Sequence, residues 1–438
     1  MLRRPRREEP GFSSTGPAFR RPGRRTRGAR VTRKWTPRYR TVTARLYVSA
    51  SFNHNSLMGD ILTMKRFRTG TLALALASGL AACGGGEGGS GEGATPGGMA
   101  KGAAAPGGTV ALTGAGATFP YPIYSKWFDS YGRANPVRVT YGSIGSGGGI
   151  RQVTEGTVDF GASDAPMNDE ELAKAPGMLH IPTVLGAVTV AYNLPGVQQP
   201  IRLSGDVLSD VFLGRITKWN DPRIAGLNPG AALPARDILV VYRTDGSGTT
   251  YVFTDYLSAV SPAWKQQVGV GKSVKWPTGL GAKGNEGVAG QVKQTEGAVG
   301  YVELAYARQT GLQTASVQNR AGQFVQPSVA ATTAAAEGLA ARLGAGSDFR
   351  VSIVNPAGAA AYPIASWTYL LVPPQIGDCA KARALVDVVR WGMGAQGDAQ
   401  ASELHYAPLP ADVERLVLAR LSTVTCGPDR QPVAAAAG

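Results

Sequence analysis

Apolar positions recur with two different spacings between residues 109 and 424. Ile123, Trp127 and Tyr131 stand four positions apart within residues 120–134, which predicts a helix with one buried face. Residues 183–192 are almost continuously apolar, which predicts a buried strand. The same two patterns predict further strands over 110–113, 137–141, 158–162, 238–242, 298–302 and 367–372, and further helices over 149–155, 207–213, 249–260, 330–345 and 380–392. Because strands and helices alternate, we expect an α/β fold with parallel or mixed sheets, in a region long enough for two domains.

The chain before residue 64 has no sustained apolar period and is strongly basic. Residues 1–63 contain 15 Lys and Arg but 3 acidic residues. Two interpretations are open: a basic arm that binds nucleic acid, or a mis-annotated extension upstream of the true start of the protein. We favour the second, because a secretion signal follows directly.

Residues 64–82 have the pattern of a signal peptide. Three basic residues precede an apolar stretch of small residues over 71–80, which is too short to span a bilayer stably. The stretch ends in Leu-Ala-Ala-Cys at Cys83, which resembles the lipobox of bacterial lipoproteins, in which the cysteine is lipidated and becomes the new N-terminus. The alternative is an ordinary signal peptide followed by a chance cysteine.

The net charge of the chain depends on whether residues 1–82 are counted. The whole chain carries a formal net charge of +15, and residues 1–82 contribute all of that excess. From Cys83 onward 27 basic and 27 acidic residues balance. A neutral mature chain gives no support for a nucleic-acid partner.

The ends of the mature chain look different from its middle. Residues 83–108 are mostly Gly, Ala, Ser, Pro and Glu, which predicts a flexible linker. Residues 427–438 are expected to form a disordered tail. Cys379 and Cys426 lie in a chain expected to be exported, where they could pair as a disulfide or remain two free thiols.

Three loops place Gly, Ser or Thr where a predicted strand ends and a helix begins: residues 113–119, 145–149 and 243–250. The first N–H groups of a helix have no intrahelical partner and lie at the positive end of its dipole, so such junctions suit an anion. No Lys follows Gly248 as in a nucleotide-binding P-loop, and Phe119 stands where a dinucleotide-binding loop needs its third Gly. We therefore expect an oxyanion site rather than a nucleotide site.

Six short segments form one set of motifs. They are Leu-Thr-Gly-Ala-Gly-Ala-Thr-Phe-Pro (112–120), Val-Asp-Phe-Gly-Ala-Ser-Asp-Ala-Pro (158–166), Asp-Gly-Ser-Gly-Thr (245–249), Val-Lys-Trp-Pro (274–277), Gly-Asn-Glu-Gly-Val-Ala-Gly (284–290) and Gly-Ala-Val-Gly-Tyr-Val-Glu (297–303). Together they resemble the phosphate-binding proteins (PstS family) of the phosphate-specific ABC importer, and the resemblance runs from about Ala111 to Pro410.

This resemblance implies a hinged, two-domain periplasmic binding protein fold of the class II type, with mixed sheets flanked by helices and the ligand in the interdomain cleft. Residues 109–191 and 359–426 would form the first domain, and residues 192–358 the second. Strands near Ala191 and Ala361 would form the hinge about which the cleft closes.

The resemblance also implies a phosphate site. The residues implied to contact phosphate are Thr118, Phe119, Ser146, Asp164, Arg243, Ser247, Gly248 and Thr249. Arg243 would make a bidentate, charged contact and Asp245 would steady it, while the loop residues would donate hydrogen bonds. For each Ser or Thr taken alone, capping of a helix N-terminus is an alternative role.

Asp164 is unexpected in an anion site, because an ionised carboxylate repels an anion. Phosphate near neutral pH keeps at least one proton, however, and a carboxylate can accept a hydrogen bond from that P–OH group. Fully ionised sulfate has no such proton, so it would meet only repulsion and leave a buried acceptor unpaired. We therefore expect Asp164 to select phosphate; the alternative is that it caps a helix near Asn168.

The resemblance implies a binding protein rather than an enzyme. It would be a monomer in the periplasm, held to a bacterial membrane by the lipid on Cys83, and would deliver inorganic phosphate to the permease and ATPase subunits of the importer. No cofactor, metal or catalytic residue is expected, since the mature chain has no metal-site spacing of His or Cys. Two alternatives remain: a phosphate-ester hydrolase in which His180 activates Ser146 or Ser247, and a binder of another tetrahedral oxyanion such as sulfate or molybdate.

Overall fold

The computed structural model of the protein describes residues 108–344 and 346–433. The expected upstream extension, the signal peptide, Cys83 and the linker up to residue 107 lie outside the described residues. Residues 434–438 of the expected tail lie outside them as well.

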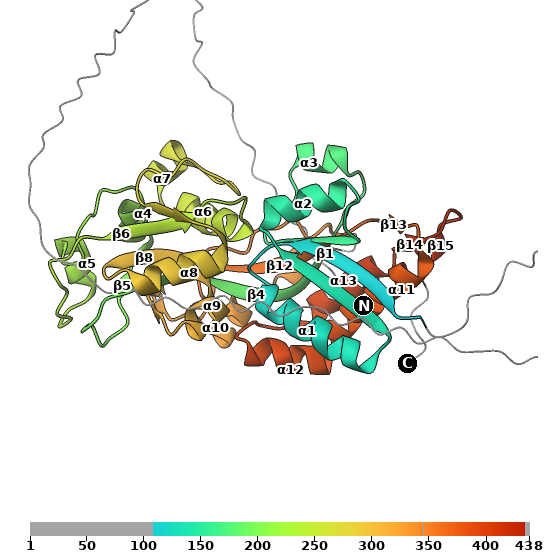
Figure 1. The fold of residues 1–438 in the computed structure, drawn as a ribbon. Helices are drawn as coiled ribbons and strands as arrows, with labels where there is room; N and C mark the ends of the chain where they lie inside the picture. The colour runs from blue at the N-terminus through green and yellow to red at the C-terminus, as the bar shows by residue number, and fades with distance from the viewer. Residues whose placement is uncertain (1–107, 345, 434–438) are drawn as a thin grey trace, which may run out of the picture. The chain divides into compact units, whose positions relative to one another are not determined.

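A mixed sheet of nine strands runs through the described part of the chain (Figure 1). Its hydrogen-bonded order is β2-β1-β3-β12-β4-β8-β6-β7, and β9 pairs with β4. The strands are β1 (Val110–Gly116), β2 (Val137–Ser143), β3 (Phe160–Ser163), β4 (Leu179–Tyr192), β6 (Leu239–Arg243), β7 (Leu280–Ala282), β8 (Ala298–Glu303), β9 (Gln313–Thr314) and β12 (Ala365–Val372). We call β2, β1, β3 and β12 the first half of this sheet, and β8, β6 and β7 the second half.

Strand β4 joins the two halves because it is long enough to serve both. Its residues 179–187 pair antiparallel with β12, and its residues 188–192 pair antiparallel with β8. Every residue of β4 is buried, as expected of a strand that lies between two others and is covered on both faces. Elsewhere β1 is parallel to β2 and β3, and β6 is parallel to β8 and β7. The expected α/β fold with a mixed sheet is confirmed.

Helices cover this sheet, with α1, α2 and α11 against the first half and α6 and α8 against the second (Figure 1). The helices are α1 (Tyr121–Ala134), α2 (Ser146–Thr154), α3 (Asp169–Lys174), α4 (Gly205–Phe212), α5 (Pro222–Leu227), α6 (Gly248–Val260), α7 (Pro262–Gln267), α8 (Gly284–Gln294), α9 (Leu304–Gln309), α10 (Val329–Ala335), α11 (Cys379–Gly392), α12 (Ala395–Glu403) and α13 (Ala411–Leu421). Two small sheets complete the description, one of β5 (Arg202–Leu203), β10 (Ser316–Gln318) and β11 (Phe324–Val325) and one of β13 (Gln375–Ile376), β14 (Thr425–Cys426) and β15 (Gln431–Pro432).

The first half of the sheet gathers segments from both ends of the described chain (Figure 1). The indole N–H of Trp127 in α1 donates to the carbonyl of Gly397 in α12 at 3.0 Å. Lys381 of α11 forms an ion pair with Asp159 at 2.9 Å. Contacts between residues so far apart in the sequence fix the first half as one packed body built from two segments. The further division into domains at residues 191 and 359 stays a prediction.

Two expectations about the later part of the chain are wrong. Residues 427–433 are ordered rather than disordered: β15 pairs antiparallel with β14, the N–H of Gly427 donates to Ile376 at 3.0 Å, and Cys426 forms a disulfide with Cys379. The helix expected over 330–345 ends ten residues early, at Ala335, and a 3₁₀ turn follows over Ala340–Arg342. Gly338 accounts for the early end, because its φ of +69° is left-handed and incompatible with a continuous helix.

Candidate anion-binding site

The structure brings the three glycine-rich loops together at the junction of the two halves of the sheet. The loop after β1 carries Thr118 into α1, the loop after β2 ends at the start of α2, and the loop after β6 ends at the start of α6. The Ser146 hydroxyl oxygen accepts the N–H of Gly248 at 3.0 Å, and the N–H of Gly147 donates to the Gly246 carbonyl at 2.9 Å. The second and third loops are therefore in direct contact although a hundred residues separate them.

The starts of α2 and α6 supply unpaired N–H groups to this junction. Within the described residues, the N–H groups of Phe119, Ser146 and Thr249 donate to no protein acceptor. Ser146 and Thr249 lie in the first turns of their helices, where the helix dipole adds positive potential. Buried N–H groups without partners are rare in proteins, so their grouping here indicates a place for an anion.

Asp164 supplies a buried carboxylate at the same junction. One of its oxygens accepts the hydroxyl of Thr368 at 2.8 Å, and its own N–H points to the Ser146 hydroxyl at 3.4 Å. A Cβ atom on Gly248 would come within 2.5 Å of this carboxylate, so only glycine permits the approach of α6. The helix near Asn168 is capped by the Asn168 side chain itself, so the alternative role for Asp164 as its cap is wrong.

Burial governs the protonation of Asp164. Desolvation raises the pKa of its carboxyl to about 7, although the Thr368 hydroxyl and the charge of Arg243 both act to lower it. The carboxyl therefore titrates near neutral pH when no ligand is present. A group in this range can hold or release a proton as the charge beside it changes.

Arg243 is the buried cation of the site. Its Nε and Nη2 atoms donate to the two oxygens of Asp245 at 2.7 and 2.5 Å, and its Nη1 atom donates to the Thr249 hydroxyl at 3.3 Å. Although burial acts to lower the pKa of Arg243, the bond to Asp245 raises it, and the same pairing overcomes burial to lower the pKa of Asp245. One edge of the guanidinium is thus held by Asp245, and the remaining N–H groups stay free to bind an anion.

Ser247 and Phe119 help to fix the two loops that carry them. The Ser247 hydroxyl oxygen accepts the N–H of Thr250 at 3.0 Å, so Ser247 is the N-cap of α6. The Phe119 ring is buried, and a Cβ on Gly186 would come within 2.5 Å of it. The Phe119 carbonyl accepts the hydroxyl of Tyr406 at 2.6 Å, which fixes the peptide that carries the loop into α1.

Sequence reasoning missed Asn285. This fully buried residue opens α8, and its side chain donates to the hydroxyls of Thr118 at 2.7 Å and Thr249 at 3.1 Å. The segment 284–290 was recognised as a motif, but nothing in it indicated that the side chain of Asn285 would reach two of the loops. Only the packing of α8 beside the loop after β1 creates these contacts.

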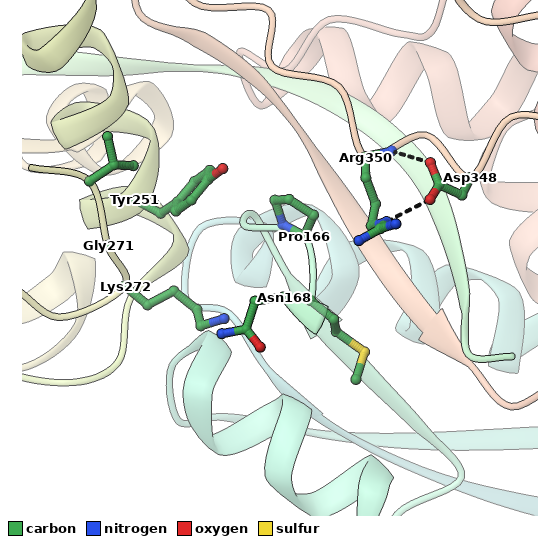
Figure 2. Close-up of a pocket in the computed structure, with 9 residues that line it drawn as sticks. Pro166, Asn168, Tyr251, Gly271, Lys272, Asp348 and Arg350 are labelled. Carbon is green, nitrogen blue, oxygen red and sulfur yellow. Dashed lines mark hydrogen bonds and ion pairs between the residues drawn. The ribbon is translucent and has the colours of Figure 1, made fainter. Parts of the chain in front are cut away.

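A separate pocket of about 550 Å³ lies next to the site (Figure 2). Its walls include Pro166, Tyr251, Lys272 and Arg350, and the figure shows Arg350 paired with Asp348. Lys272 also forms an ion pair, at 2.6 Å, with Glu171 of α3. Both cations of this pocket are therefore paired with carboxylates, as Arg243 is with Asp245.

Comparisons with known proteins place the chain in a family. Residues 103–391 match the family model described as a PBP superfamily domain. The chain is 47% identical to the phosphate-binding protein PstS of Pasteurella multocida over 313 residues, which cover 71% of this chain and 90% of that protein. It is 46% identical to the phosphate-binding protein PstS of Xylella fastidiosa (strain Temecula1) over 310 residues, which cover 70% of this chain and 84% of that protein. The chain belongs to the PstS family.

A solved structure agrees with this family at the level of the fold. The phosphate binding protein from Stenotrophomonas maltophilia superposes with a TM-score of 0.56 and 24% identity, over 71% of this chain and 93% of that protein. The resemblance inferred from the motifs is confirmed by the relatives of 46–47% identity. The roles of the individual site residues stay predictions.

The phosphate-ester hydrolase alternative needs a histidine that activates a serine of the loops, and the described residues show no such pair. Burial lowers the pKa of His180 to about 4, so the ring is neutral, and its Nε2 atom accepts the N–H of Met167 at 3.0 Å. No hydrogen bond within 108–344 and 346–433 joins either His180 or His405 to a serine or threonine of the loops. The same residues hold no cluster of three potential metal ligands and no helix long and apolar enough to cross a membrane.

Proposed function

We propose that this protein binds inorganic phosphate between the three loops and delivers it to an ABC permease for import. The observation that carries the proposal is the grouping of many donors around the buried carboxylate of Asp164. Unpaired N–H groups, three hydroxyls and Arg243 surround the junction where Asp164 lies. A tetrahedral oxyanion that keeps one proton satisfies every one of these groups.

In this proposal each predicted residue has a defined task. Phe119, Ser146 and Thr249 donate their free N–H groups, Arg243 neutralises the anion, and Asp164 accepts the P–OH proton. Gly248 permits the close approach of α6, and Ser247 caps that helix so that its dipole points at the ligand. Thr118 and Ser146 add hydroxyl donors.

The inter-half contacts support closure around the ligand. Gly248 donates to Ser146, Asn285 donates to Thr118, and Lys272 donates to Glu171. Each of these bonds joins a loop or helix on the side of the first half to one on the side of the second half. We propose that binding is coupled to formation of these contacts and that the linking strands, β4 and the chain near Ala361, act as the hinge. The domains then correspond to residues 109–191 with 359–426, and to 192–358.

The cellular setting is also a proposal. The relatives named above are called phosphate-binding protein PstS, and a binding protein of this kind works with permease and ATPase subunits in a membrane. We propose that lipidation of Cys83 holds the mature protein, as a monomer, at a bacterial membrane facing the periplasm.

The test of this proposal is thermal unfolding of the purified protein with and without phosphate. A ligand that binds only the folded state raises the midpoint in proportion to the logarithm of its concentration. We expect millimolar phosphate to raise the midpoint and the protein to release no phosphate from an aryl phosphate ester. No shift would refute binding, and steady release of phosphate from the ester would favour the hydrolase.

A further inference from the structure

Asn285 connects the first loop to the third through one side chain. Its Oδ1 atom accepts the N–H of Glu303 at 2.9 Å, so the opposite end of the amide must be the NH₂ group. That group donates to the Thr118 hydroxyl at 2.7 Å and to the Thr249 hydroxyl at 3.1 Å. The backbone N–H of Asn285 donates to the Thr118 hydroxyl as well, at 3.1 Å. The orientation of the amide is thus set by a backbone group that can only donate.

These bonds use up the accepting capacity of both threonine hydroxyls. A hydroxyl has two lone pairs and one hydrogen. The Thr118 oxygen accepts two N–H groups, both from Asn285, and the Thr249 oxygen accepts one from Asn285 and one from Arg243 at 3.3 Å. Each hydroxyl can then form a further hydrogen bond only by donating its hydrogen.

The accepting capacity of the Ser146 hydroxyl is also used up, by donors other than Asn285. Its hydroxyl oxygen accepts the N–H of Gly248 at 3.0 Å and the N–H of Asp164 at 3.4 Å. All three hydroxyls at the junction are therefore confined to donating. Asp164 is then the group left there to accept a proton from the ligand.

We propose that Asn285 is a positioning residue that holds the hydroxyls of Thr118 and Thr249 as donors to the bound anion. The inference rests on the proposed function, because it assigns a role at the same phosphate site. Asn285 can do this only when the loop after β1 meets the start of α8, so the donor set is complete only when the two halves of the sheet are in contact. Closure of the site and orientation of its hydroxyls become one event.

A double-mutant cycle tests the proposal, with inorganic phosphate as the titrant in calorimetry of the full chain. Asn285→Ala and Thr118→Val should each weaken phosphate binding by about tenfold, the size of one lost hydrogen bond. Because Asn285 acts through that hydroxyl, the double variant should lose much less than the product of the two single losses. The cycle with Thr249→Val should show the same coupling.

Asn228 is the matched control, because it is also a buried asparagine whose amide holds two segments together. It accepts the N–H of Arg202 at 2.7 Å and donates to the carbonyls of Arg202 and Ile224 at 2.9 Å. Asn228→Ala should lower the midpoint of thermal unfolding yet leave the affinity for phosphate unchanged. A fall in affinity for this variant equal to that of Asn285→Ala would reduce Asn285 to a residue that merely stabilises the fold.

A pH profile gives a second readout. In Asn285→Asp the ionised carboxylate would accept from the threonine hydroxyls and turn their hydrogens away from the ligand, whereas the protonated form could donate again. The titratable and charged groups near this position are common to both proteins: Asp164, Arg243, Asp245, Glu286, Glu303 and Tyr306. The ratio of variant to wild-type affinity should therefore recover as the pH falls.

The outcomes separate the two proposals. If wild-type protein takes up no phosphate, the proposed function fails. If wild-type protein binds phosphate but the losses in the cycles multiply, or the ratio does not change with pH, the role of Asn285 is overturned while the proposed function stands.

Discussion

Replacing Asp164 by Asn changes the charge of the site while it keeps the shape of the side chain. The amide oxygen can still accept the Thr368 hydroxyl, which now donates to the carboxylate at 2.8 Å. The other oxygen becomes an NH₂ group, so the variant donates where the ionised Asp164 of the wild type can only accept. Asp164→Asn therefore inverts the one interaction that we expect to distinguish phosphate from sulfate.

The two anions should respond differently. Phosphate loses a charge-assisted hydrogen bond of about 1.5–3 kcal/mol, but it also loses a nearby negative charge, and these terms oppose each other. Its affinity should change by less than about tenfold. Sulfate gains in two ways. The repulsion by the carboxylate disappears, and so does the penalty of about 1–3 kcal/mol for leaving that buried acceptor without a partner. Its affinity should rise by about 10- to 100-fold.

Calorimetric titration of both proteins with both anions at pH 7.5 measures these changes. Thr368→Val is the control, because it removes a hydrogen bond to Asp164 but keeps the carboxylate itself. That variant should continue to exclude sulfate. Sulfate that binds no better to Asp164→Asn than to wild type, together with loss of phosphate binding, would show that Asp164 is only a structural carboxylate.

The ligand-free variant should also differ in stability. Burial raises the pKa of Asp164 from 3.8 to about 7, so the folded state holds its proton more tightly than the unfolded chain does. The wild type should therefore lose stability as the pH rises from about 4 to about 7, by at most about 4 kcal/mol. Asp164→Asn should lack this loss when unfolding is measured in denaturant across that range, and parallel curves would contradict the assignment.

Three further changes follow from the same geometry. Arg243→Ala should weaken phosphate binding by about 3 kcal/mol, and Arg243→Lys by less, since lysine keeps the charge but not the fork; equal, small losses in titration would exclude Arg243 from the site. Gly248→Ala should weaken binding because its Cβ would meet Asp164 at 2.5 Å, whereas the control Gly290→Ala, which has open space around it, should bind as wild type does; similar affinities for both would contradict the close approach. Cys83→Ser should move the protein from the membrane fraction to the soluble one or leave it unprocessed, and unchanged partitioning on fractionation would refute lipidation.

Local patterns predicted the parts of the site that depend on neighbours in the sequence. Each loop lies between a strand and a helix, and the first residues of α2 and α6 can be anticipated from Gly and Ser alone. The pairing of Arg243 with Asp245 spans two residues and is equally local. The motif resemblance supplied Asp164, whose carboxylate no periodicity would have singled out.

Long-range packing explains what the sequence did not show. Asn285 reaches Thr118 across 167 residues, and only the packing of α8 beside the loop after β1 makes that contact. Residues 427–433 are ordered by the pairing of β15 with β14, next to a disulfide between Cys426 and a cysteine 47 residues earlier, and the local sequence shows neither contact. Strand β4 begins at Leu179, before the apolar run at 183, because residues 179–182 pair with β12. His180 is buried there, and its Nε2 atom accepts the N–H of Met167.

The most direct measurement of the central claim is calorimetry of the wild-type protein with phosphate, sulfate and arsenate in turn. Phosphate should bind one to one, arsenate should also bind because it keeps a proton at neutral pH, and sulfate should give no heat. Binding of sulfate as strong as that of phosphate would contradict the role of Asp164. The absence of any heat with millimolar phosphate would contradict the site itself.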